Sequence, residues 1–184
     1  MKQGTFACLI LFCMLVVSAV AKENSRQDDA AKQPGISAGG NWLEFDKKDP
    51  ITDAKRVRFE IEADNFLRNS GYYKPKIEIF CKDNGEFSAA QFDPNVKIGP
   101  PNRPGFWGQP QLEVRVRADD KHSNHGWNWI NGKFLSMDKG STRELVRAKV
   151  FKIEFPSLGG PEIANFSPAG LDIERFRQAC GLKD

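Results

Sequence analysis

The densest group of side chains that could do chemistry lies in residues 119–125, which read Asp-Asp-Lys-His-Ser-Asn-His. The segment holds two carboxylates and both histidines of the chain, His122 and His125. Imidazole and carboxylate are suitable ligands for zinc, copper or nickel, and two histidines three apart could converge on one ion if the segment turned. Exposed loops are also rich in Asp, Asn, Ser and His, because these residues favour turns. We expect an exposed loop here and no bound metal.

No other pattern in the sequence indicates an active site. We expect neither histidine to activate a serine or cysteine as a nucleophile, and the chain has no H-E-x-x-H, P-loop or dinucleotide-binding motif. Glu60 and Glu62 alternate on one strand, which is ordinary for acids on an exposed strand face. The sequence therefore predicts no catalytic residues, no cofactor and no enzyme activity.

The N-terminus has the pattern of an export signal. One positive charge at Lys2 precedes the apolar run 6–17, and the small residues at 18–21 follow it, so we predict a signal peptide over residues 1–21 with cleavage after Ala21. The alternative, a retained membrane anchor, is disfavoured because a hydrocarbon core needs about 20 apolar residues. We expect a periplasmic or secreted protein with no membrane span after cleavage.

Cleavage would leave two cysteines, Cys81 and Cys180, in a chain that reaches an oxidising compartment. We predict that they form a disulfide, and the alternative is two buried free thiols. Without Lys2 the chain has 26 basic and 24 acidic residues, because the whole sequence has 27 and 24. This near-neutral balance gives no support to nucleic-acid binding, which favours a strongly basic face.

Residues 22–40 combine charge, Gln, Gly and Ala without an apolar period, so we predict a flexible linker there. Residues 41–184 have the size of one domain. In it, alternation of apolar and polar residues and two hairpin signals, 83–85 and 131–132, predict strands. The expected strands cover 56–62, 76–82, 86–92, 112–117, both sides of 131–132, 150–155 and 163–166.

Two short helices complete the expected domain. Ser141 to Glu144 fits a capping box that opens a helix ending near Ala148. The second helix would end at Gly181, with Cys180 on its buried face. Several short strands favour a mainly β, β-rich α+β fold, in which an antiparallel sheet is curled or forms a sandwich. The disulfide would link the C-terminal helix to a strand.

The loop at 99–110 contains four prolines together with Phe106 and Trp107. Prolines cannot donate to a strand ladder, so the segment is expected to be irregular. The two aromatic residues either cover the core or are displayed to a partner. If they are displayed, they are the first candidates for contacts with a partner protein.

Several short motifs resemble those of the small exported bacterial domains that include the type VI secretion-associated VasI-like proteins. They are Trp42, the Asp-Pro-Ile-Thr-Asp at 49–53, the Ile-x-Ile-x-Cys at 77–81, the segment 165–171, and Cys180-Gly181. The resemblance implies the β-rich fold, the disulfide and a periplasmic accessory role, and it supplies no catalytic residues. The loop at 99–110 and the histidine-containing segment depart from the family pattern.

The sequence thus predicts a non-enzymatic exported protein that binds another protein in the cell envelope, in a type VI secretion apparatus or another assembly. The alternative is an inhibitor or immunity protein against an exported toxin or hydrolase. A third reading, a metal-dependent envelope enzyme, would require residues 119–125 to bind a metal.

Overall fold

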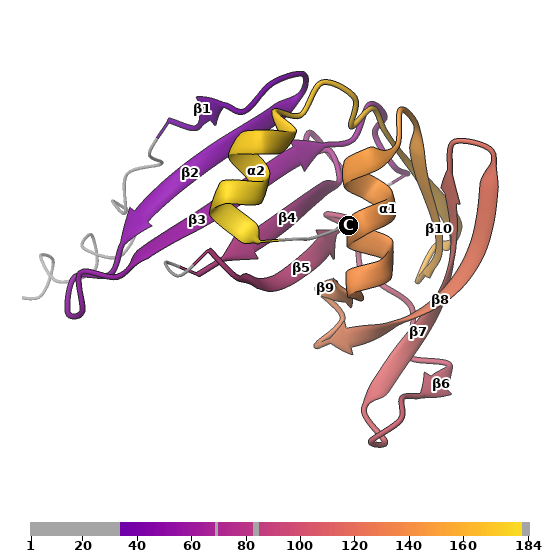
Figure 1. The fold of residues 1–184 in the computed structure, drawn as a ribbon. Helices are drawn as coiled ribbons and strands as arrows, with labels where there is room; N and C mark the ends of the chain where they lie inside the picture. Colours follow the sequence, from indigo (N-terminus) through magenta and orange to yellow (C-terminus); the bar gives the residue numbers. More distant parts are fainter. Residues whose placement is uncertain (1–33, 69, 83–84, 182–184) are drawn as a thin grey trace, which may run out of the picture. The chain divides into compact units, whose positions relative to one another are not determined.

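The computed structural model describes residues 34–68, 70–82 and 85–181, and these form one antiparallel sheet with two short helices (Figure 1). The predicted signal peptide, most of the predicted linker and two residues of the turn at 83–85 lie outside the described residues. No helix in the described part of the chain is long and apolar enough to cross a membrane.

The sheet has eleven strands in the order β1-β2-β3-β4-β5-β9-β8-β7-β10-β11, with β6 paired to β7. The mainly β prediction is confirmed, although more strands form than the sequence indicated. The elements are β1 (Ile36–Ser37), β2 (Trp42–Lys48), β3 (Lys55–Glu62), β4 (Lys76–Cys81), β5 (Phe87–Asp93), β6 (Arg103–Pro104), β7 (Pro110–Ala118), β8 (Lys121–Ile130), β9 (Phe134–Met137), α1 (Lys139–Arg147), β10 (Phe151–Ser157), β11 (Gly160–Phe166) and α2 (Ile173–Cys180).

The sheet curls so that its inner face packs against itself. Phe92 on β5 lies with its ring centroid 5.2 Å from that of Phe155 on β10 and 6.2 Å from that of Phe166 on β11. Three strands separate β5 from β10 in the sheet order, so only a strong curl brings these rings together. A β-bridge between Ile98 and Ser157 joins the segment after β5 to the end of β10. The predicted curled sheet therefore encloses one aromatic core.

Helix α2 covers the inner face near β3 and β4. Its Phe176 packs edge-on against Phe59 at 5.0 Å between ring centroids, and Cys180 is bonded to Cys81 with the two Cα atoms 4.9 Å apart. Gly181 ends the helix in the left-handed region at φ 56°, the conformation that favours glycine at a C-cap. The predicted disulfide between the C-terminal helix and a strand is confirmed.

The predicted linker reaches too far into the chain. The compact unit begins at Gly35, and Ala38 is 1% exposed. Gly39 and Gly40 have φ of 94° and 54°, and a Cβ on either would lie 2.2 Å from a backbone oxygen of the segment 169–170. Residues 35–40 are therefore ordered by backbone packing, which their polar composition does not reveal.

We predict that the variant Cys81→Ser/Cys180→Ser loses about 2–5 kcal/mol of unfolding free energy, because the bond closes a long loop in the unfolded chain. The two cysteines are 99 residues apart. Urea unfolding of the variant and of the oxidised and reduced wild type measures this. The reduced wild type should match the variant, and a variant as stable as the oxidised protein would contradict the prediction.

Candidate functional site

An aromatic pair is displayed at the tip of the loop between β6 and β7. Phe106 is 88% exposed and Trp107 is 86% exposed, and their rings meet edge to face at 4.8 Å between centroids. Of the two alternatives that the sequence left open for these side chains, the structure therefore shows display. We call Phe106 and Trp107 the aromatic tip.

The backbone of this loop is tightly held. Pro104 pairs with Pro110 where β6 meets β7. Gly105 N–H donates to the carbonyl oxygen of Gln109 at 2.8 Å, and Trp107 N–H donates to the Gln109 side-chain oxygen at 2.9 Å. In Figure 1 the loop projects beyond the rest of the sheet. The aromatic tip is thus presented on a short braced extension.

Residues 119–125 do not form one loop, and this prediction was wrong. Asp119 and Asp120 make a two-residue turn, with Asp119 at φ 53°, and β8 begins at Lys121. Because successive strand residues point to opposite faces, His122 and His125, three apart, lie on opposite faces of the sheet. They cannot converge on one ion. Within the described residues, no group of three His, Cys, Asp or Glu side chains is placed to hold a metal ion.

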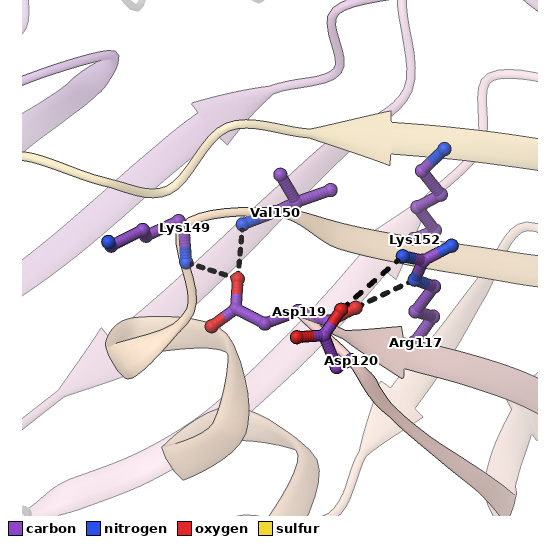
Figure 2. Close-up of a pocket in the computed structure, with 6 residues that line it drawn as sticks. All are labelled: Arg117, Asp119, Asp120, Lys149, Val150 and Lys152. Atoms are coloured by element: carbon purple, nitrogen blue, oxygen red, sulfur yellow. Dashed lines mark hydrogen bonds and ion pairs between the residues drawn. The ribbon is translucent and has the colours of Figure 1, made fainter.

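Asp119 of this turn joins the β7–β8 hairpin to the segment before β10, beside an open pocket (Figure 2). One carboxylate oxygen of Asp119 accepts the backbone N–H groups of Lys149 and Val150, each at 2.9 Å. Arg117 donates to the Asp119 carbonyl at 2.7 Å. Figure 2 shows the Lys149 and Lys152 side chains extending in different directions. The basic groups of the pocket therefore do not converge on one ligand.

His125 belongs to a half-buried network at the start of α1. Its Nδ1 lies 3.0 Å from Asp138 Oδ2, and its Nε2 lies 2.8 Å from Ser123 Oγ. Asp138 is the N-cap of α1 and accepts the backbone N–H and the hydroxyl of Ser141, both at 2.8 Å. The N-cap therefore lies three residues before the predicted cap at Ser141. Ser141 is instead a residue of the first turn, whose backbone N–H donates to the Asp138 cap.

The hydrogen-bonded series Ser123–His125–Asp138 has the connectivity of a nucleophile, a base and an orienting carboxylate. No sequence pattern indicated it, because the aspartate comes from a different element. The Asp138 carboxylate is also shared with the Ser141 cap and with the Trp127 indole N–H at 3.2 Å. Since the Asp138 bonds either cap α1 or tie its first turn to β8, we interpret the network as structural.

A G-x-S-x-G pentapeptide occurs once in the sequence, at residues 35–39. The hydrolase motif of that form needs a sharp strand-to-helix turn that exposes the serine. Here Ser37 lies in β1 and pairs with Leu43 of the neighbouring strand. The pentapeptide is therefore an edge strand and a glycine turn rather than a nucleophile elbow.

A charged cluster lies on the outward face of β3 and β4. Glu60 lies directly opposite Glu78, whereas Glu62 is exposed. Lys76 Nζ lies 3.5 Å from Glu60 and 3.2 Å from Glu78, and Arg58 contacts both carboxylates. Burial raises the pKa of Glu60. Burial also acts to raise the pKa of Glu78, but the Gln91 amide and the two cations outweigh it, so this pKa is lowered. The charges of Glu60 and Glu78 are therefore balanced by neighbouring groups of the protein itself.

Comparisons of the chain with models of protein families, with curated proteins and with solved structures found no match. The geometry of the chain itself must therefore support any functional proposal. The polar clusters are used in internal contacts, and the aromatic tip is the predicted site that the fold presents to solvent.

Asp138 should make the stability depend on pH. Burial acts to raise its pKa, but the Ser141 amide and hydroxyl and the charge of His125 outweigh it, so its pKa is lowered on folding. The resulting stabilisation is complete above the ordinary carboxyl pKa of about 4 and is lost as the pH falls through the lower folded value. We predict that Asp138→Ala costs about 1 kcal/mol at neutral pH.

The variant Asp138→Asn is the matched control, because asparagine retains the cap acceptor and lacks the charge. Urea unfolding should place it between the wild type and Asp138→Ala at neutral pH, and its difference from the wild type should shrink in acid, at about pH 3. If the difference in unfolding free energy between Asp138→Asn and the wild type grows in acid, the prediction is contradicted.

Proposed function

We propose that this chain is an exported, non-enzymatic domain that binds another protein in the cell envelope, as an accessory of a type VI secretion apparatus or a similar assembly. The observation that carries the proposal is the display of Phe106 and Trp107, 88% and 86% exposed, on a braced loop. The disulfide is compatible with an oxidising compartment. The resemblance of the sequence to VasI-like proteins and the predicted signal peptide support the envelope location.

The energetics favour binding at the aromatic tip. Burial of a large apolar side chain from water contributes about 1.5–3 kcal/mol. Ordering a mobile loop would offset part of that gain, but the hydrogen bonds at Gly105 and Trp107 already fix this backbone. Aromatic residues in such settings are frequent energetic anchors of protein interfaces. The tip therefore has the composition and rigidity of an anchor.

The alternative function, inhibition of an exported toxin or hydrolase, is favoured by the same projecting shape. A narrow extension with an aromatic end fits a concave enzyme site better than a flat surface. The two functions differ in the partner captured. An assembly component supports the accessory role, and a single hydrolase or toxin bound in equal amount supports inhibition.

We predict that Phe106→Ala/Trp107→Ala weakens binding of the captured partner by about 30-fold or more, the effect of losing one strong interface anchor. The tagged mature domain is used to capture partners from a cross-linked envelope extract, and the affinity of the recovered partner is then measured. The melting temperature should change by less than about 2 °C, because neither side chain contributes to the core.

The matched control is Tyr72→Ala/Tyr73→Ala, which removes two other exposed aromatic residues, 97% and 71% exposed, from a different loop. It should leave the affinity unchanged. Equal losses in both double variants would indicate nonspecific aromatic contacts, and unfolding of Phe106→Ala/Trp107→Ala would assign the pair to the core. Either result contradicts the proposal.

A further inference from the structure

The sheet leaves one long strand unpaired along half of one side. β8 has ten residues and pairs with β7 through residues 121–128. On its other side lies β9, which has four residues and pairs only with Asn128, Trp129 and Ile130 of β8. After Met137 the chain leaves the sheet to begin α1 at Lys139. Residues 121–127 of β8 therefore have a neighbouring strand on the β7 side alone.

The hairpin geometry identifies the backbone groups on the open side. Ala118 and Lys121 close a two-residue turn, so this pair exchanges both of its backbone hydrogen bonds. Because the pattern alternates along an antiparallel strand, His122, Asn124 and Gly126 direct their N–H and C=O groups away from β7. Within the described chain, no backbone or side-chain hydrogen bond involves these groups. We call these three residues the β8 edge.

The β8 edge is reachable from solvent. The side chains of His122 and Asn124 are exposed, whereas Gly126 is half-buried, with the Gln111 and Arg103 side chains over its outward face. Unpaired backbone groups must bond to water or to another chain, because a buried N–H or C=O without a partner is costly. An exposed row of this kind is a template for an added strand.

We propose that the β8 edge binds an extended segment of the partner protein as an additional β-strand. This inference rests on the proposed function, because it specifies how a protein partner is held. Three residues with outward N–H and C=O groups offer up to six backbone hydrogen bonds. Such main-chain pairing supplies affinity, and the neighbouring side chains supply selectivity.

The charges beside the edge indicate the chemistry of the added segment. Arg115 and Arg117 on β7 lie directly across from Asn124 and His122 on the outward face. Arg115 is paired with Glu154 and Arg117 lies 3.8 Å from Asp120, yet their side chains remain 67% and 45% exposed. An added strand would lie two strand spacings, about 9.5 Å, from β7, a distance that long acidic and guanidinium side chains can span on the shared outward face. Acidic residues at alternate positions of that strand would therefore complement Arg115 and Arg117. The added strand is therefore expected to be an acidic extended segment of the partner.

The free protein provides the first test, by amide hydrogen exchange followed by NMR. The amides of His122, Asn124 and Gly126 should exchange rapidly, whereas those of Ser123, His125 and Trp127, bonded to β7, should be protected. Slow exchange at all six positions would show that the protein already covers this edge, and would overturn the proposal.

The second test uses a phage-displayed library of peptides of about seven residues, the length of an ordinary strand. Selected peptides should be enriched in alternating acidic residues and should protect the amides of His122, Asn124 and Gly126 in the wild-type protein. Asn124→Pro removes one outward donor from a position where proline is tolerated, and it should weaken binding by about tenfold. Asn124→Ala keeps the backbone donor and should bind within about twofold of the wild type.

The outcomes separate this inference from the proposed function. Peptides that bind Asn124→Pro as tightly as the wild type but lose affinity for Phe106→Ala/Trp107→Ala overturn strand addition and leave the aromatic tip as a binding site. Recovery of no peptide above background, or a dimer joined through this edge in solution, also contradicts the inference. If Asn124→Pro does not fold, the exchange protection in the wild-type protein decides.

Discussion

The structure depends on a single sheet that must bury its own inner face. The described residues contain two short helices, so the strands cover the core by curling. Phe92 shows the result, since its ring contacts Phe155, Phe166 and Trp127 from three other strands. Helix α2 covers part of this inner face, and the bond between Cys81 and Cys180 fastens it to β4. Helix α1 begins where β9 ends. The short β9 that permits this crossing is also the reason that β8 has an open edge.

The internal use of polar groups limits where a functional site can lie. The polar groups that invite chemical interpretation are used inside the fold: Asp138 and His125 hold the start of α1, and Glu60 and Glu78 are balanced by neighbouring cations. Three tryptophans, Trp42, Trp127 and Trp129, donate their indole N–H groups within the domain, whereas Trp107 is 86% exposed. In the described part of the chain, the aromatic tip and the β8 edge are directed at solvent. Both are suited to contacts with another chain.

The sequence predicted those elements in which one strand face is buried and the other is not. Val57, Phe59 and Ile61 are buried in alternation and were assigned correctly. β2 gave no such signal, because Glu44 is buried in an ion pair with Arg175 while Leu43 is exposed. The turn-forming residues correctly indicated a turn at Asp119 and Asp120, but the polar residues after them form a strand.

The unpredicted features arise from contacts between distant segments. Strand order depends on which hairpins meet when the sheet curls, and no local pattern encodes this. The Ser123–His125–Asp138 network requires knowledge that α1 begins beside β8. Exposure of Phe106 and Trp107 likewise could not be decided from the loop sequence, because an apolar pair in a proline-rich loop can as well cover a core. The unpaired side of β8 follows from the length of β9, which the hairpin signal at 131–132 does not specify.

The proposed function places the contact with another protein at the aromatic tip. Its most direct test is site-specific photo-cross-linking in intact cells, with a photoreactive amino acid at position 107 in one strain and at position 51 in another. Ile51 is 91% exposed and lies outside both proposed contact features, so it controls for general accessibility. The account predicts a discrete cross-linked protein from position 107 and none from position 51. No adduct at position 107, or the same adducts from both positions, would contradict it.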